Sequence, residues 1–257
     1  MTLDFKVWID KAEKFNNDEL LPDSIRALLI GSSNSGKTTL LFRMLLQPGF
    51  LDYDNLYIFS KSLHQPEYKI LLKGFMNGLG KKDIIQVFEI MNRLGSAADL
   101  DTVCQYLSGD AIAKGGITVS AFNSNTTIPD PTQLDSAKKN LIIFDDVIFE
   151  KQDKISDYYT RGRHNNTQCF YISQAFMKIP KFTVREDANL IILFKLTDKD
   201  VKNVFDTYIA SDMTYKEFKL FCSKVWSESF NFVVIDRFNS DPNWRYRKGF
   251  ETPFDSV

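Results

Sequence analysis

The chain has 257 residues, a length that fits one large α/β domain or two small ones and suffices to bury a substantial core. Hydrophobic residues make up 44% of it, as is ordinary for a globular protein. Lysine and arginine (32) nearly balance aspartate and glutamate (33), and the net charge of -1 excludes a protein that coats nucleic acid over its whole surface, though not a local basic patch or a charged pore built by several subunits.

Short apolar runs alternate with helical spacing in the first third of the chain. Residues 21–30 end in an apolar run that stops at Gly31, which predicts a buried strand. Residues 38–46 carry apolar side chains at helical spacing until Pro48 and Gly49, which predicts a helix. We also predict a strand over 55–60, a helix over 67–79 and a third strand over 84–89.

Residues 92–140 differ from their surroundings because Gly, Ser, Asn, Thr and Asp are frequent there. We interpret this stretch as a soft insertion with a weak helix over 97–107, loops, and one strand over 117–122. Regular structure then returns. We predict strands over 141–144, 168–172, 190–194 and 230–235, and helices over 155–162 and, as a pair, over 198–224.

Strands that alternate with helices predict a mainly parallel sheet covered by helices on both faces. The sequence therefore predicts an α/β fold. We expect a core over residues 1–197, which includes the soft insertion 92–140, and a small α/β extension over residues 198–257 packed on that core.

The segment GSSNSGKT, residues 31–38, matches the phosphate-loop pattern G-x-x-x-x-G-K-[ST]. Gly31 and Gly36 permit the tight turn that brings backbone N–H groups to phosphate oxygens, and the following helix points its positive end at the same anion. Lys37 supplies charge to the β and γ phosphates, and the Thr38 hydroxyl is a magnesium ligand. The predicted nucleotide-binding residues are Gly31, Ser32, Ser33, Asn34, Ser35, Gly36, Lys37, Thr38 and Thr39. The alternative is a chance Gly/Ser turn, but the motif leaves an apolar strand and opens an apolar helix.

A second motif, LIIFDD, covers residues 141–146 and is an apolar strand that ends in two acids. We predict that Asp145 holds the magnesium ion and that Asp146 is the base that polarises the attacking water. Asp146 is shorter than the glutamate that many ATPases carry at this position. The alternative is that both acids only cap the next helix.

The spacing of the two motifs favours ATP over GTP. The predicted strand 84–89 between them indicates an extra strand, as in the additional-strand (ASCE, RecA-like) class of P-loop ATPases. GTPases have a D-x-x-G turn and an N-K-x-D motif, whereas Asp145 is followed by Asp146 and Val147, and N-K-x-D does not occur. We therefore predict ATP and Mg²⁺ as the cofactors.

Three further side chains are catalytic candidates. Gln174 ends the strand FYISQ, where it could reach the γ-phosphate or the attacking water, although a structural hydrogen bond to a loop is the alternative. Arg161 and Arg163 close the helix after Asp145 and lie too far along the chain to return easily to their own nucleotide. They are candidates for an arginine finger that acts on a neighbouring subunit, with Arg163 preferred, or they only complement the helix dipole.

The motifs GSSNSGKT, NLYIFS, LIIFDD and YYTRGRHNNTQCFYISQ, in this order, resemble the poxvirus-type genome-packaging ATPases of the FtsK/HerA superfamily. These enzymes occur in large DNA viruses and their virophage and Polinton-like relatives, and the resemblance covers roughly residues 25–194. It implies a motor that translocates double-stranded DNA into a preformed capsid. It also implies a homo-oligomeric ring of five or six subunits, a capsid or portal-vertex partner, and a viral protein of the host cytoplasm or virus factory, free or associated with the virion.

The DNA-contacting surface is less determined by the sequence. Lys178 and Lys181 lie on a segment after the Gln174 strand, and Arg245, Arg247 and Lys248 form a second cationic cluster. Either cluster could neutralise phosphates, and solvated surface charge explains each equally well. A DNA helicase or transfer pump of the same superfamily and a DNA-independent assembly switch are the alternative functions.

Cysteine usage and hydropathy bear on the cellular compartment. Cys104, Cys169 and Cys222 lie far apart without a C-x-x-C pair, which predicts buried free thiols. No N-terminal stretch has the apolar centre of a signal peptide, and no apolar run approaches the ~18 residues of a membrane span. We therefore expect a soluble protein in a reducing compartment, without a membrane partner.

Overall fold

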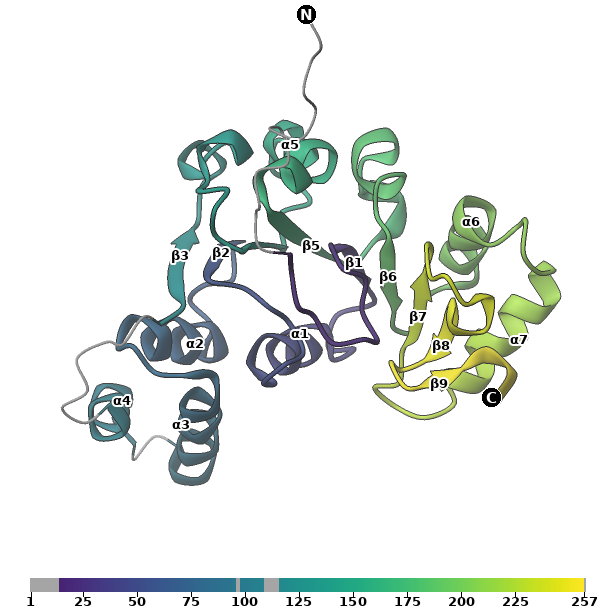
Figure 1. The fold of residues 1–257 in the computed structure, drawn as a ribbon. Helices are drawn as coiled ribbons and strands as arrows, with labels where there is room; N and C mark the ends of the chain where they lie inside the picture. Colours follow the sequence, from purple (N-terminus) through teal and green to yellow (C-terminus); the bar gives the residue numbers. More distant parts are fainter. Residues whose placement is uncertain (1–13, 96–97, 109–115, 257) are drawn as a thin grey trace, which may run out of the picture.

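The computed structural model describes residues 14–95, 98–108 and 116–256, and these residues build one nine-stranded sheet. The strands are β1 (Arg26–Ile30), β2 (Asn55–Ser60), β3 (Thr118–Phe122), β4 (Asn140–Asp145), β5 (Thr167–Ser173), β6 (Leu190–Leu193), β7 (Val233–Asp236), β8 (Tyr246–Lys248) and β9 (Thr252–Pro253). Their order across the sheet is β3-β2-β4-β5-β1-β6-β7-β8-β9 (Figure 1). Neighbours from β3 to β6 pair in parallel, and β6 to β9 pair antiparallel.

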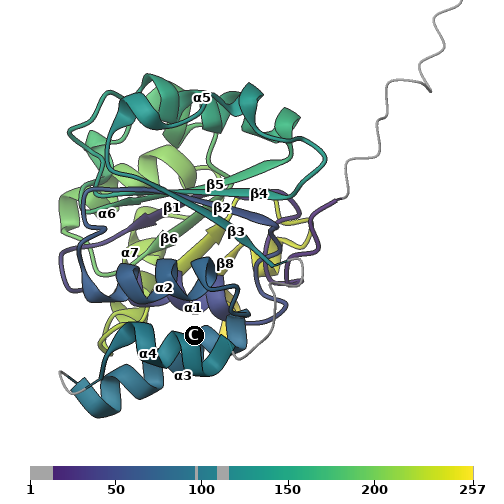
Figure 2. The ribbon, with the colours of Figure 1, turned by 90° about the vertical axis from the view of Figure 1, so that its left-hand side faces the viewer.

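Helices cover both faces of this sheet. They are α1 (Lys37–Leu46), α2 (Pro66–Met76), α3 (Lys81–Leu94), α4 (Leu100–Ser108), α5 (Asp153–Arg161), α6 (Asp198–Tyr208) and α7 (Tyr215–Val225). One hydrophobic core joins α1 to α4 with one face of the sheet, and a second joins α5, α6 and α7 with the other face. Figure 2 shows α1 and α2 on one side of the strands and α5 on the opposite side. The predicted α/β fold with a mainly parallel sheet is confirmed.

Most predicted elements are found close to their expected positions, but the predicted strand 84–89 is wrong. These residues lie inside α3, where Ile84 and Val87 are buried and Ile85, Phe88 and Met91 are partly buried against the same core. Such spacing fits a helix face. Asp83 accepts a hydrogen bond from the Gly80 N–H and so closes the start of the helix.

The additional strand between the two motifs is present, but it is a different strand from the predicted one. In the sheet, β5 lies between β1, which leads into residues 31–38, and β4, which ends at Asp145. The additional-strand class is therefore confirmed on the position of β5 rather than of residues 84–89.

The last quarter of the described chain, from α6 onward, continues the same sheet. Strand β7 pairs with β6, so α6, α7 and β7 to β9 extend the layer that β1 to β6 begin. An aromatic series links the two parts. The ring centroids of Phe232 and Phe194 are 5.5 Å apart, those of Phe232 and Phe250 are 5.3 Å apart, and those of Phe250 and Phe50 are 5.0 Å apart. The three cysteines are buried free thiols, as predicted.

Candidate active site

The loop between β1 and α1 has the conformation that anion binding requires. Asn34 and Gly36 have φ angles of 60° and 100°, so successive N–H groups turn toward one side of the loop. Gly36 is also the N-cap of α1, and the first turn of α1 contains no acidic residue. The positive end of the helix is therefore left for an external anion.

Gly31 is required for a steric reason. A Cβ atom built on it would lie 2.6 Å from Cβ of Phe194 and 2.7 Å from Oγ of Ser35. Both distances are shorter than contacts between such atoms allow, so a side chain at Gly31 would displace the loop or β6. The backbone at this point is also tied to the sheet, since the Gly31 N–H donates to the Ser173 carbonyl at 3.2 Å.

The Lys37 ammonium group is held against this loop. Its Nζ donates to the carbonyl oxygens of Gly31 at 2.8 Å and of Ser32 at 2.6 Å. Burial lowers the pKa of Lys37, and the negative charges of Asp145 and Asp146 oppose that shift. The two carbonyls accept hydrogen bonds from the ammonium but carry no net charge. A phosphate chain in the loop would give the ammonium a close anionic partner.

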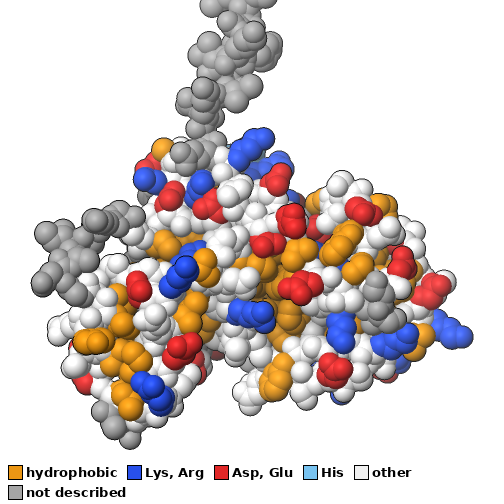
Figure 3. Space-filling view, turned by 60° about the horizontal axis from the view of Figure 1, so that its bottom comes forward, with side chains coloured by type: hydrophobic (Ala, Val, Ile, Leu, Met, Phe, Trp, Pro, Cys, Tyr) orange, Lys and Arg blue, Asp and Glu red, His pale blue; other side chains and the backbone are white. Residues whose placement is uncertain are grey.

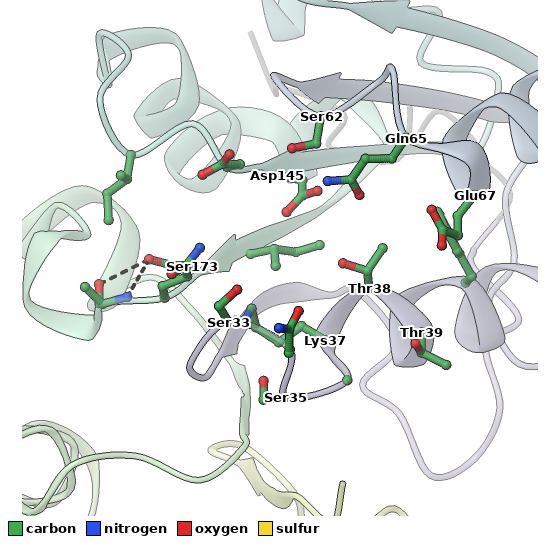
Figure 4. A pocket seen from close by; sticks show the side chains of 18 of the residues that line it. Ser33, Ser35, Lys37, Thr38, Thr39, Ser62, Gln65, Glu67, Asp145 and Ser173 are labelled. Atoms are coloured by element: carbon green, nitrogen blue, oxygen red, sulfur yellow. Dashed lines mark hydrogen bonds between the residues drawn. The ribbon is translucent and has the colours of Figure 1, made fainter.

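A cleft of about 610 Å³ opens above the loop (Figure 4). Figure 4 shows Asp145, Ser62 and Gln65 across the cleft from Lys37 and Thr38. The predicted residues that line it are Ser33, Asn34, Ser35, Gly36, Lys37, Thr38, Thr39, Asp145, Asp146 and Gln174. Four strands meet here at their carboxyl ends, because the parallel register sets Ser60 beside Asp145 and Ile30 beside Ser173.

Asp145 is buried at the end of β4 and is fixed by two hydroxyl groups. The Tyr68 hydroxyl donates to its Oδ2 at 2.5 Å, and the Ser60 hydroxyl lies 3.5 Å from the same atom. Burial raises the pKa of Asp145, while the bond from Tyr68 and the charge of Lys37 lower it. Both hydroxyls hold Oδ2, which leaves Oδ1 for a ligand.

The donor set at this end of the cleft suits magnesium. The Thr38 hydroxyl and the Asp145 carboxylate are hard oxygen ligands, and magnesium typically takes one or two carboxylates together with phosphate oxygens and water. These residues fit the ion that the motifs imply.

Asp146 and Gln174 also border the cleft, each directly after a strand. Asp146 is exposed and has a φ angle of 55°, a conformation that costs a non-glycine residue about 1–3 kcal/mol and that is concentrated at functional sites. The turn directs the two adjacent acids differently, because Asp145 is buried and Asp146 faces solvent. Gln174 is exposed at the end of β5.

The structure places Arg161 and Arg163 away from this cleft. Arg161 ends α5, and Arg163 lies in the 3-10 turn that follows, just before the start of β5. Both are at the amino ends of the parallel strands, whereas the cleft lies at the carboxyl ends. Arg161 pairs with Asp157 at 2.7 Å, and Arg163 borders a separate cavity of about 850 Å³ together with Arg26. Neither arginine lines the cleft.

The two cationic clusters differ in exposure. Lys178 and Lys181 are exposed, and Lys178 lines the cleft. In the second cluster, Arg247 is 0% exposed and donates to the carbonyls of Leu20 and Phe250. The prediction that this cluster forms a cationic surface is wrong for Arg247. Its neighbours are also paired, Arg245 with an aspartate at 2.6 Å and Lys248 with a glutamate at 3.8 Å.

Sequence reasoning missed the contribution of the segment after β2. Gln65 and Glu67 line the cleft, and Tyr68 binds Asp145 from the first turn of α2. The sequence alone shows only that this segment follows a predicted strand; its position beside the acidic pair comes from the pairing of β2 with β4. Two exposed aromatic residues at the cleft, Phe149 and Phe230, were also missed.

Fold and site together define an α/β P-loop NTPase fold of the additional-strand class. No protein-family profile matches the chain, and no curated protein sequence matches it. Among the described residues, no helix is long and apolar enough to cross a membrane.

Two of the solved structures with a similar fold come from Sulfolobus viruses. The chain is similar to the genome packaging NTPase B204 from Sulfolobus turreted icosahedral virus 2 in complex with sulfate, with 14% identity, a TM-score of 0.52, and coverage of 89% of this chain and 96% of that one. It is similar to B204, the DNA-packaging ATPase from Sulfolobus turreted icosahedral virus, with 13% identity, a TM-score of 0.51, and coverage of 88% and 97%. The resemblance to viral packaging ATPases that the motifs indicate is thus confirmed at the level of the fold.

Proposed function

We propose that the chain is an ATPase whose hydrolysis of ATP drives double-stranded DNA into a preformed viral capsid. One observation carries the proposal. The phosphate loop with Lys37 and Thr38 and the acidic pair Asp145 and Asp146 border one cleft at the carboxyl ends of neighbouring strands. The packaging role is supported by the fold shared with B204, a packaging NTPase that has also been solved in complex with AMP.

Each group in the cleft has a task in this reaction. Lys37 and the loop N–H groups bind the β and γ phosphates, and Thr38 and Asp145 hold the magnesium ion. The ion, when bound, offsets charge that develops on the phosphate oxygens. Asp146 accepts the hydrogen bond of the attacking water, and Gln174 contacts the γ-phosphate or that water from the neighbouring strand.

The proposed enzyme works as a ring of five or six copies. Of the described residues that line the cleft, none is an arginine, and Lys37 and Lys178 are the cations among them. Arg161 and Arg163 lie at the opposite edge of the sheet, where a ring could present them to the next subunit. We propose Arg163, with Arg161 as the alternative, as the finger that completes a neighbour's site.

DNA would contact the exposed lysines beside the cleft. Gln174, Lys178 and Lys181 all lie in the segment that follows β5, so hydrolysis and DNA contact would share one segment. Figure 3 shows acidic and basic side chains interspersed on the face turned forward, with neither sign dominant. This pattern fits a protein that grips DNA locally and transiently inside a ring. A capsid or portal-vertex protein in the infected cell would be its partner.

Steady-state ATP hydrolysis, measured with and without long double-stranded DNA, tests the proposal. We expect DNA to stimulate hydrolysis by the wild type and the Lys37→Ala variant to be inactive in both conditions. Lys219→Ala serves as the matched control, because Lys219 is an exposed lysine paired with Asp198 on the far helices. Slow hydrolysis that ignores DNA would contradict the motor and favour an assembly switch, and strand displacement would favour a helicase.

Mixed rings test the finger. A Lys37→Ala subunit lacks its own site but keeps its arginine, and an Arg163→Ala subunit keeps its site but lacks the arginine. Mixing the two should restore hydrolysis at interfaces where an intact site meets an intact arginine. Mixtures as inactive as the separate variants, for Arg163 and for Arg161, would contradict action across subunits.

A further inference from the structure

Two exposed aromatic residues border the nucleotide cleft, and they differ in their surroundings. Phe149 follows the acidic pair, and the Lys178 ammonium lies 4.9 Å from its ring centroid. Phe230 lies on the other side, against the start of α1. A Cβ atom built on Gly36 would be 3.2 Å from Cδ1 of Phe230. In the order of the sheet, β4, which ends at Asp145, and β7, which follows Phe230, lie on opposite sides of β1, so Phe230 flanks the phosphate loop on the side away from the acids.

The backbone of Phe230 is held in an unfavourable conformation that exposes the ring. Its φ angle is 66°, which is an outlier for a bulky side chain and costs about 1–3 kcal/mol. The ring is nevertheless 70% exposed, although burial of a phenylalanine stabilises a fold by about 1.5–3 kcal/mol. Phe230 thus departs both from the preference for a negative φ angle and from the preference of phenylalanine for burial. Such a combination is expected at functional sites.

Neighbouring residues fix the segment around this ring. Phe232, two residues after Phe230, packs on Phe194 and Phe250 at centroid distances of 5.5 and 5.3 Å. The chain is therefore anchored in the core directly after Phe230. The Asn231 side chain donates to the Glu228 carboxylate at 2.8 Å, a hydrogen bond that spans Phe230. The ring of Phe230 is therefore presented by an anchored segment rather than by a free loop.

We infer that Phe230 forms the subsite on which the base of the nucleotide stacks. The inference rests on the proposed nucleotide binding and extends it to the base. Because Asp145 and Asp146 are proposed to face the metal ion and the attacking water at the γ-phosphate, the ribose and base would lie at the opposite end of the phosphate chain, away from these acids. On that side of Gly36 the described cleft offers the exposed Phe230 ring and the exposed Thr39.

Stacking on Phe230 would not select one base over another. An aromatic ring stacks on the π-face that every base has, and it offers no hydrogen bond that distinguishes adenine from guanine. Phe230 thus contributes affinity for nucleotides in general. Because the residue lies between α7 and β7, the nucleotide would contact both the loop of the core and the C-terminal part of the chain.

Calorimetric titration of the full chain with two probes, each with Mg²⁺, tests the inference. AMP-PNP presents phosphates and a base, whereas inorganic tripolyphosphate presents phosphates alone. Phe230→Ala should lower the affinity for AMP-PNP by about 5- to 150-fold, the range that base stacking supports. Its affinity for tripolyphosphate should stay within about twofold of the wild type. The affinity of Phe230→Ala for GMP-PNP should fall by the same factor as its affinity for AMP-PNP. Phe230→Trp should bind both nucleotides like the wild type.

Two variants make the result interpretable. Phe238→Ala is the matched control, because Phe238 is 68% exposed and is not among the residues that line the cleft. Phe230→Gly removes the ring and also relieves the positive φ angle, so it should be at least as stable as the wild type to heat and still lose the affinity for AMP-PNP.

Each outcome bears on the inference. If Phe230→Ala and Phe230→Gly weaken AMP-PNP no more than Phe238→Ala does, the base does not stack on Phe230. If they weaken tripolyphosphate as much as AMP-PNP, Phe230 only shapes the loop through Gly36, and the inference is overturned. If the wild type binds neither probe, the proposed function itself fails, and the base subsite fails with it.

Discussion

Removal of the Tyr68 hydroxyl should weaken magnesium use without removing a single predicted motif residue. In the structure this buried hydroxyl donates to Oδ2 of Asp145 at 2.5 Å, and the other hydroxyl nearby, that of Ser60, is 3.5 Å away. Tyr68→Phe would leave Oδ2 with one marginal partner. A hydrogen bond to a charged group contributes about 1.5–3 kcal/mol, and groups that orient a metal ligand typically change metal affinity or activity by 10- to 100-fold.

The assay is the Mg²⁺ dependence of ATP hydrolysis at saturating ATP. We expect the Mg²⁺ concentration at half-maximal rate to rise by about tenfold or more in Tyr68→Phe. Tyr53→Phe is the matched control, because the Tyr53 hydroxyl is also buried and donates to the Leu45 carbonyl at 2.7 Å, at the far end of α1. If both variants lose stability but keep the wild-type Mg²⁺ dependence, Tyr68 does not position Asp145 and the reasoning is refuted.

Three further predictions follow from the same site. Gly31→Ala should lower the unfolding free energy by about 1–3 kcal/mol and abolish nucleotide binding, since its Cβ would lie 2.6 Å from Cβ of Phe194. Asp145→Asn should abolish hydrolysis yet raise Tm at neutral pH, because burial disfavours the carboxylate. Lys178→Gln with Lys181→Gln should make DNA binding less salt-dependent, with the slope of log K against log salt reduced by up to about 1.8.

Controls and contrary results can be stated for each. Gly162→Ala should be tolerated, since its nearest atom would be 3.6 Å away, and equal damage there would contradict the steric argument. The raised pKa of Asp145 means that its carboxylate destabilises the fold only as pH rises through that pKa, so the gain in Asp145→Asn should vanish well below pH 4. A gain that persists there would refute burial as the cause.

For the DNA-binding prediction, the control removes equal charge elsewhere. Lys199 and Lys216 are exposed on α6 and α7, away from the cleft, and a Lys199→Gln, Lys216→Gln protein should keep the wild-type salt dependence. An equal loss of slope in both double variants would mean that overall charge, and no local contact at Lys178 and Lys181, governs binding.

The sequence predicts the parallel centre of the fold well because those strands are continuous apolar runs. Residues 84–89 were misjudged for a physical reason. Their β-branched residues have strand propensity, but the apolar positions continue to Met91 at helical spacing and pack on α1 and α2. Strands β8 and β9 were missed because they are only three and two residues long, and β9, at the edge of the sheet, contains a proline.

Some residues of the candidate site could be predicted from the sequence and others could not. Contiguous motifs, such as residues 31–38 and the acids after β4, can be read from the chain because chemistry and local structure coincide in them. Tyr68 and Phe230 could not, since each matters through a contact with a distant residue, Asp145 in one case and Gly36 in the other. The burial of Arg247 was likewise not predictable, because its carbonyl partner on Leu20 lies 227 positions away.

The central position of β1 has a consequence for synthesis of the chain. The Ile25 N–H donates to the side chain of Gln168, 143 positions later, and the Arg26 N–H to that of Asn189, 163 positions later. At about 5–20 residues per second, a ribosome supplies these partners on the order of 10 to 30 s after β1 emerges. Until then the apolar strand β1 has no neighbouring strands to pair with and stays exposed. Nascent chains should therefore depend on chaperones that shield β1.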